Sequence, residues 1–301
     1  NATGNVNNTK TDLNGVQRLA EAKEQAKNTI ENLQYLNEAQ REQAKSNVTD
    51  STTKDDIASQ LVKYQTLNTS MKALRDSVAN NEDVKRGSDY INEDSEPRET
   101  YDQAVSNAQS IINAQSNPQM DADVVNQTAQ AVTTAQNNLH GQQKLEEAQH
   151  SAITEINNLT HLTTAQKEAE NALINSKSTR TEVQSQLEKA KALDNSMGTL
   201  IELVNNQTQV QRKSNYINED QPEQTAYNSA ISTGQTIIDK TNNPVLDKNT
   251  VDEAINNINT KISELHGEQK LANAKTNAIS GINTLADLNT PQRNAIIDAV
   301  N

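Results

Sequence analysis

The sequence contains a repeat with a period of 126 residues. The string Ser-Asp-Tyr-Ile-Asn-Glu-Asp at 88–94 returns as Ser-Asn-Tyr-Ile-Asn-Glu-Asp at 214–220. Other positions occur in three copies at the same spacing: Gly15, Gly141 and Gly267, and Leu36, Leu162 and Leu288. A long fixed period is typical of arrays in which one structural unit follows another. We therefore expect the chain to fold as successive copies of one unit.

The copies define the expected units. Residues 15–140 form a first complete unit and residues 141–266 a second. Residues 1–14 match the end of a preceding unit, and residues 267–301 match the start of a third. Because the sequence begins and ends within units, we expect it to belong to a longer array.

The apolar spacing is helical throughout. In the first unit Leu19, Ala22, Ala26, Ile30 and Leu33 form one stripe with steps of 3 and 4, which is the pattern of an amphipathic helix. A second helix should carry Gln40, Ala44 and Val48, and a loop with capping residues should follow at 50–53.

The longest stripe predicts one helix from about Lys54 to Asn80. Such a helix would be roughly 40 Å long, about twice what one small bundle needs. We therefore expect its first half to complete one three-helix bundle and its second half to begin the next. Its copy in the second unit contains Gly198, which weakens the helix there.

Two further helices complete each unit. One should begin near Pro97 and end before Asn117-Pro118, because the residue before proline is pushed out of helical geometry. In the second unit Asp220 and Glu223 have capping-box spacing at the start of this helix. The last helix should be capped by Asp121 or Asp247 and end or bend at Gly141 or Gly267.

The predicted fold class is all-α. Each unit should contain about five helices that form two three-helix bundles joined end to end by the shared long helix. Two units would then make an elongated rod on the order of 100 Å long.

Composition excludes several classes of function. Hydrophobic residues make up 33% of the chain, below the usual ~45–50%, which favours small bundles over one large core. The net charge of −13 disfavours nucleic acid and anionic membranes as partners, and the chain has no cysteine and no apolar run of membrane-spanning length. Catalytic motifs are absent, so we expect that the chain is not an enzyme and has no catalytic, cofactor-binding or metal-binding residues. We also expect it to be a monomer.

Three groups of residues leave alternatives open. The strings Asn92-Glu93-Asp94 and Asn218-Glu219-Asp220 could bind a hard cation or cap helices, and we favour capping because the 12-residue calcium-loop pattern is missing. His140 and His266 are expected near a helix C-terminus, where they would interact favourably with the helix dipole.

The tyrosines form the third group. The pairs Tyr90/Tyr101 and Tyr216/Tyr227 contain four of the six aromatic residues. They could contact a sugar or a protein, or they could seal the end of a bundle with each hydroxyl reaching solvent or a loop backbone. We favour sealing.

The repeated residues resemble two known families. Leu67–Gly141, with Tyr101-Asp102-Gln103-Ala104-Val105, Asn117-Pro118 and Leu139-His140-Gly141, resembles a FIVAR module, and Leu19–Leu67 resembles a GA module. The implied modules are GA-like at about 15–66 and 141–192, and FIVAR-like at about 67–140 and 193–266. Alternating GA and FIVAR modules occur in giant staphylococcal cell-surface proteins.

The resemblance implies an extracellular location at the bacterial cell surface or cell wall, in a parent protein that is membrane-anchored. It also implies roles in adhesion to host matrix and in cell-envelope integrity. We therefore expect a structural rod segment, and the alternative is a repeated binding module for fibronectin, serum albumin or cell-wall or host polysaccharide. Which residues would bind such a partner is unknown from the sequence.

Overall fold

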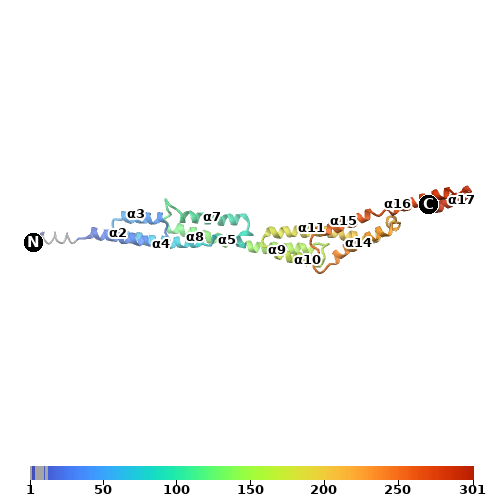
Figure 1. Cartoon of the computed structure of the whole chain (residues 1–301). Helices are drawn as coiled ribbons and strands as arrows, with labels where there is room; N and C mark the ends of the chain where they lie inside the picture. The colour runs from blue at the N-terminus through green and yellow to red at the C-terminus, as the bar shows by residue number, and fades with distance from the viewer. Residues whose placement is uncertain (1, 4–9, 11–12) are drawn as a thin grey trace. The chain divides into compact units, whose positions relative to one another are not determined.

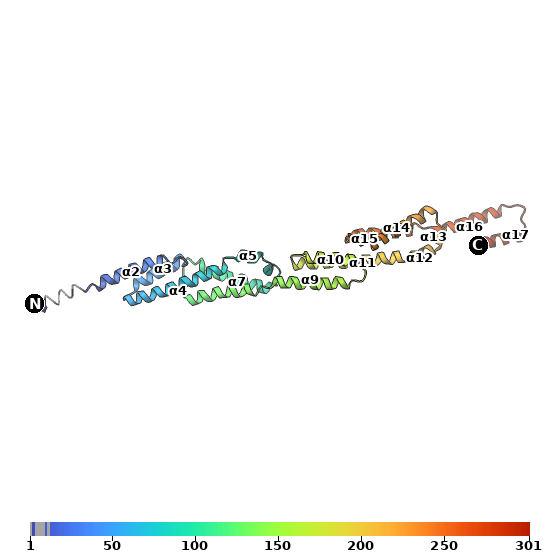
Figure 2. The ribbon, with the colours of Figure 1, turned by 90° about the horizontal axis from the view of Figure 1, so that it is seen from below.

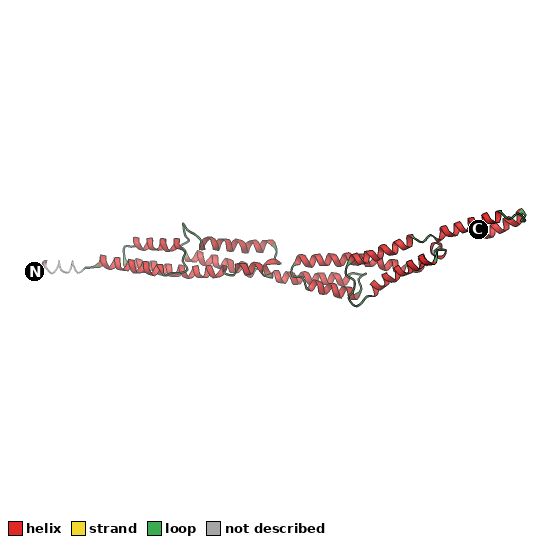
Figure 3. Cartoon of the chain, in the orientation of Figure 1, coloured by secondary structure: helices red, strands yellow, loops and turns green. Residues whose placement is uncertain are grey.

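The computed structural model describes residues 2–3, 10 and 13–301, and in that part of the chain every regular element is an α-helix (Figure 3). Most of the predicted tail at residues 1–14 lies outside the described residues. The chain divides into two compact units, Asn1–Leu145 and Glu146–Asn301. No helix in the described part is both long and apolar enough to cross a membrane.

The described residues of the first unit form five long and two short helices (Figure 1). They are α2 (Gly15–Glu31), α3 (Glu38–Asp50), α4 (Lys54–Val78), α5 (Asn81–Arg86), α6 (Ser88–Ile91), α7 (Ser95–Ile112) and α8 (Ala122–Asn137). Helix α9 (Gly141–Asn158) begins in the first unit and ends in the second.

The second unit repeats this order. It contains α10 (Thr164–Asn175), α11 (Arg180–Asn205), α12 (Gln207–Gln211), α13 (Ser214–Ile217), α14 (Gln221–Asp239), α15 (Lys248–Ser263), α16 (Gly267–Asn283) and α17 (Thr290–Val300). The prediction of an all-α fold is confirmed. The two short helices between the long helix and the next one, α5–α6 and α12–α13, were not predicted.

Helix α4 contributes to two hydrophobic cores in the first unit. Its first half adds Ile57 and Tyr64 to a core formed with α2 and α3. Its second half adds Leu67, Met71 and Leu74 to a core formed with α7 and α8. Figure 2 shows α4 running alongside α3 at one end and α7 at the other. The prediction of one helix shared by two three-helix bundles is therefore confirmed for this unit.

Local sequence explains why α4 stays helical over 25 residues. The hydroxyl of Thr53 accepts a hydrogen bond from the Asp56 N–H, which satisfies one of the free donors at the N-terminus. Asp55 and Asp56 lie in the first turn and Arg75 in the last, which complements the helix dipole. No proline or glycine interrupts the helix.

Helix α11 is the corresponding long helix of the second unit. It begins with a capping box between Thr179 and Glu182, and its first half buries Val183 and Leu187 and contacts α10. The residues Leu193, Met197 and Leu200 of its second half lie in the core formed with α14 and α15. Its glycine has a packing role, because a Cβ at Gly198 would lie 3.1 Å from the His161 ring.

The breaks between helices partly differ from the predictions. Helix α7 begins at Ser95, two residues before Pro97. The chain does turn at the expected Asn-Pro pairs, but Asn117 and Asn243 have φ of 48° rather than the extended geometry that the following proline favours. Asparagine tolerates this left-handed conformation better than most residues.

Gly141 and Gly267 are the first residues of α9 and α16, rather than the ends of the preceding helices. The prediction of a helix end or bend at these glycines was therefore wrong. His140 and His266 consequently lie at the start of a helix, and His266 is the N-cap of α16. The predicted capping box at Asp220 is also absent, because its side chain makes no capping hydrogen bond.

Candidate functional site

The repeated Ser-x-Tyr-Ile-Asn-Glu-Asp string holds the N-terminus of the helix that follows its bundle. In the first unit the Glu93 carboxylate accepts a hydrogen bond from the His140 N–H and pairs with Lys144 Nζ. Asp89 Oδ1 accepts a hydrogen bond of 3.1 Å from the Gln142 N–H. We name this arrangement, residues 88–94 around residues 139–144, the junction clasp.

The second unit contains the same clasp at residues 214–220 and 265–270. Glu219 accepts from the His266 N–H and pairs with Lys270. Asn215 Oδ1 accepts a hydrogen bond of 3.1 Å from the Glu268 N–H. In each clasp two side chains of the string therefore satisfy backbone donors at a helix N-terminus, and those donors have no partner within their own helix.

The clasp explains the repeated glycine. A Cβ on Gly141 would lie 2.5 Å from the Asp89 carbonyl oxygen, and one on Gly267 would lie 2.6 Å from the Asn215 carbonyl oxygen. Both contacts are with backbone, which cannot rotate away as a side chain can. Glycine is therefore needed at the first position of α9 and α16.

Electrostatics keep the clasp carboxylates charged. The side chains of Glu93 and Glu219 are each only 1% exposed. Hydrogen bonds from Lys270 and from the Asp220 and His266 N–H groups lower the pKa of Glu219 to about 2. Burial acts to raise the pKa of Glu93, but hydrogen bonds from Lys144 and two backbone N–H groups outweigh it and hold that pKa below its usual value.

The carboxylates of Glu219, Asp220 and Glu223 lie within 4.8 Å of one another, as the ligands of a cation would. The Lys270 ammonium group forms ion pairs with Glu219 and Asp220, so these two carboxylates already have a positively charged partner in the place of a cation. The structure thus supports capping for these strings, but they cap the helix of the next bundle rather than their own.

The tyrosine pairs pack as edge-to-face contacts. Ring centroids are 6.1 Å apart for Tyr90 and Tyr101, and 5.9 Å apart for Tyr216 and Tyr227. Tyr101 and Tyr227 are fully buried. The prediction that each pair closes a bundle is consistent with this packing.

The tyrosine hydroxyls differ from the prediction. Tyr90 Oη donates to Asp102 over 2.8 Å, and Tyr216 Oη accepts from Asn228 over 2.8 Å. The hydroxyls of Tyr101 and Tyr227 are buried with no hydrogen-bond partner among the described residues. They do not reach solvent or a loop backbone, so that part of the prediction was wrong. Burial raises the pKa of both phenols.

A second set of contacts joins the two bundles within each unit. The link between the first two helices inserts Leu36 into the core of the neighbouring bundle in the first unit, and Leu162 does the same in the second. Gln40 is fully buried, and its Nε2 donates to the Gln119 carbonyl over 2.8 Å. The counterpart Gln166 donates to the Val245 carbonyl over 2.8 Å.

Residues in the middle of each shared helix also accept hydrogen bonds from the link between the first two helices of the unit. In the first unit Asn68 Oδ1 accepts a hydrogen bond of 2.9 Å from the Tyr35 N–H. In the second unit Asp194 accepts from the His161 N–H over 2.7 Å and from the Leu162 N–H over 2.9 Å. His161 Nδ1 lies 3.0 Å from the same carboxylate. His150 is exposed.

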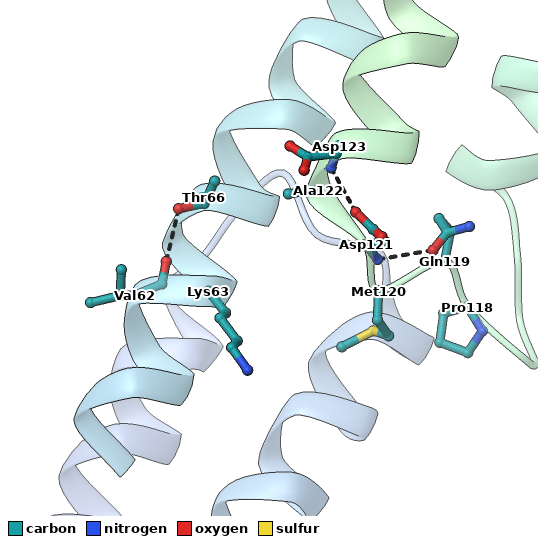
Figure 4. Close-up of a pocket in the computed structure, with 9 residues that line it drawn as sticks. All are labelled: Val62, Lys63, Thr66, Pro118, Gln119, Met120, Asp121, Ala122 and Asp123. Atoms are coloured by element: carbon teal, nitrogen blue, oxygen red, sulfur yellow. Dashed lines mark hydrogen bonds between the residues drawn. The ribbon is translucent and has the colours of Figure 1, made fainter. Parts of the chain in front are cut away.

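A groove of about 740 Å³ lies beside α4 and the link between α7 and α8 (Figure 4). It is lined by Val62, Lys63, Thr66, Pro118, Gln119, Met120, Asp121, Ala122 and Asp123. Asp121 is engaged in capping α8, since it accepts from the Asp123 N–H over 2.8 Å. At the positions of Val62 and Thr66 the second unit has Glu188 and Ala192, so the lining chemistry of the groove is not repeated.

Comparison with family models assigns two kinds of module. The FIVAR domain model matches residues 70–140 and 196–266. The GA module model matches residues 16–70, 142–196 and 268–301.

Relatives match over the whole chain. The chain is 39% identical over 300 residues to the extracellular matrix-binding protein ebh of Staphylococcus aureus strain NCTC 8325. It is 38% identical over 300 residues to the extracellular matrix-binding protein EbhA of strain Newman. Both matches cover 100% of this chain, which spans 3% and 9% of the length of these relatives.

A solved structure is also similar. The crystal structure of EbhA (756–1003 domain) from Staphylococcus aureus matches with a TM-score of 0.69 and 29% identity. The match covers 76% of this chain and 91% of that one.

Proposed function

The chain belongs to the family of extracellular matrix-binding proteins built from GA and FIVAR modules, and from this premise we propose that it is a stiff spacer segment of a bacterial cell-surface protein. In this role it would hold the adhesive parts of a much longer protein away from the cell and reinforce the envelope. The proposed repeat units are residues 15–140 and 141–266, with a third unit starting at 267.

The observation that carries this proposal is the way the modules are joined. Within each unit the change from GA to FIVAR module falls inside one continuous helix, α4 or α11. A buried glutamine and a leucine from the adjacent link fix the same boundary. Flexible linkers are rich in glycine and serine, whereas these boundaries are helical and packed, which suits a segment that must keep its length.

Small-angle scattering on the whole chain tests the spacer role. A column of in-line bundles should have a maximum dimension on the order of 100 Å or more. A compact particle of this chain length would have a radius of gyration of roughly 19 Å. A measured radius of gyration near that value would contradict the proposal.

A second candidate function is direct binding of host extracellular matrix protein, such as fibronectin, or of serum albumin or wall polysaccharide. The names of the relatives favour it, and repeated modules would convert weak contacts into avidity. The groove beside α4 presents exposed Val62 together with Pro118 and Met120 among polar residues.

Surface plasmon resonance of the whole chain over immobilised fibronectin, albumin and cell-wall glycans separates the two functions. Saturable binding that is weakened by Val62→Glu, which copies the residue of the second unit, would support a ligand site on the groove. No binding at high micromolar concentration, together with an extended particle in scattering, would leave the spacer role as the function of this segment.

A further inference from the structure

The second GA module contains a carboxylate in its interior. Glu170 on α10 is 1% exposed. The matching residue of the first GA module is Ala44, and that of the third copy is Ile296. An ionised carboxylate in a bundle core is costly unless it is paired with a positive charge or several donors.

Among the described residues, the hydrogen-bond partner of Glu170 is one neutral side chain. Its Oε2 accepts a hydrogen bond of 2.7 Å from Nε2 of Gln186, which is itself 8% exposed. Glu93 and Glu219, by contrast, each receive a lysine and backbone N–H groups. The interior of the second GA module therefore compensates its carboxylate less fully than the clasps compensate theirs.

The first GA module fills the same space with neutral groups. There Tyr64 Oη donates to Gln60, the counterpart of Gln186, over 2.8 Å, and Asn47 donates to the same hydroxyl. In the second module the tyrosine is replaced by Ala190 and the alanine by Glu170. The two modules thus exchange a large and a small residue around the same glutamine. Only the replacement of Ala44 by Glu170 brings a carboxyl group into the core.

We propose that Glu170 makes the stability of the second GA module sensitive to pH, so that this module is strengthened by mild acid while the first GA module is not. The device needs no ligand. It consists of one buried carboxyl group that is more compatible with its surroundings when it carries a proton.

The charges around Glu170 set the extent of the effect. Burial raises the pKa of Glu170, and the hydrogen bond from Gln186 and the positive charges of Lys177 and Lys189 oppose this rise only in part. The residues of α9 that are buried in this unit are Ala152 and Ile156. On α9, His150 is exposed and Glu155 pairs with Lys191 at the surface.

The sign follows from proton binding. Between the unfolded value of 4.5 and the raised pKa, the folded state holds a proton that the unfolded state releases. The stabilisation that comes from the proton on Glu170 is therefore fully present below pH 4.5 and is lost as the pH rises through the pKa of Glu170 in the folded state. Each unit by which the pKa is raised corresponds to about a tenfold change in the equilibrium constant for opening.

Hydrogen exchange on the whole chain, followed by mass spectrometry at pH 5 and pH 7, tests the proposal. The readout is the protection of residues 164–175 (α10) relative to residues 38–50 (α3), because the ratio cancels the intrinsic effect of pH on exchange. We expect this ratio to be several-fold higher at pH 5 in the wild-type chain.

Glu170→Gln should remove the pH dependence of the ratio and raise protection of 164–175 at pH 7, since the amide keeps a bond to Gln186 without a charge. Glu170→Ala, which copies the first module, should also remove the pH dependence. Glu168→Gln, an exposed glutamate on the same helix, should behave like wild type. His150 and His161 lie in the same module and are kept in all of these variants. A pH dependence that disappears in the Glu170 variants is therefore due to Glu170 and not to a histidine.

Two results would overturn the proposal. One is a pH dependence that persists unchanged in Glu170→Gln and Glu170→Ala. The other is a Glu170→Gln chain that is less protected than wild type at pH 7, which would show that the ionised carboxylate stabilises the module.

Discussion

Replacing Thr69 by proline should separate the two bundles of the first unit. Thr69 lies near the middle of α4, on its exposed side, between the residues that α4 gives to its two cores. A proline there removes one backbone hydrogen bond and clashes with the carbonyl of Gln65, which costs about 3 kcal/mol or more in a helix interior. Because the side chain is exposed, no core contact is lost directly.

The expected loss is large enough to measure. For a unit of this size about 3 kcal/mol corresponds to a drop of roughly 6–12 °C in melting temperature. Calorimetry of the whole chain should show the first unit melting earlier and in two steps, while hydrogen exchange in α11 stays as in wild type. Thr69→Ala is the matched control, since it removes the exposed γ-methyl and the hydroxyl that donates to the Gln65 carbonyl but keeps the backbone N–H. A Thr69→Pro chain that loses less than about 1 kcal/mol, or in which the first unit still melts in one step, would refute the shared-helix reasoning.

Three further predictions concern the clasp and the tyrosines. Gly267→Ala should destabilise the start of α16 by about 1–3 kcal/mol and accelerate its hydrogen exchange, whereas Gly281→Ala, which has open space around it, should stabilise the same helix by about 0.5–1 kcal/mol. Tyr101→Phe should leave the thermal stability unchanged or raise it, because the hydroxyl has no hydrogen-bond partner in the described part of the chain, whereas Tyr101→Ala should cost about 3–5 kcal/mol. The pKa of Glu219 is depressed, so the contribution of the clasp is present above pH 4.5 and is lost as the pH falls toward about 2; Glu219→Gln should remove that part of the acid transition in circular dichroism.

The helices and the shared helix could be predicted from the sequence because both depend on local spacing. The stripe through Ile57, Leu67 and Met71 has a helical period without interruption. Its length exceeds what one small bundle can cover, and the structure places its two halves in two cores.

The junction clasp could not be predicted, because it joins residues about fifty positions apart through a close approach of backbones. One signal was present. A basic residue follows each repeated glycine by three positions, as Arg18, Lys144 and Lys270. Read together with the acidic string one module earlier, this recurrence indicates an ion pair.

The interior carboxylate was also visible as a departure from the repeat. Ala44 and Ile296 predict an apolar residue at the position of Glu170, so the glutamate stands out against both copies. Its burial could not be inferred from the sequence, because its partner Gln186 lies on the neighbouring helix α11. The prediction that the hydroxyls of Tyr101 and Tyr227 reach solvent or a loop backbone was wrong for a related reason. Their burial results from packing of the rings among several helices of the bundle, which the local spacing of residues does not encode.

The shared helix is tested most directly by a distance measurement across it. The chain has no cysteine, so Asp55→Cys and Ala73→Cys allow a pair of spin labels to be placed on exposed positions of α4 without background labelling. The two positions are 18 residues and five full turns apart, and a straight helix separates them by about 27 Å. Pulsed electron paramagnetic resonance should give a narrow distribution centred near that distance, and a broad distribution at clearly shorter distances would show that the two cores do not share one helix.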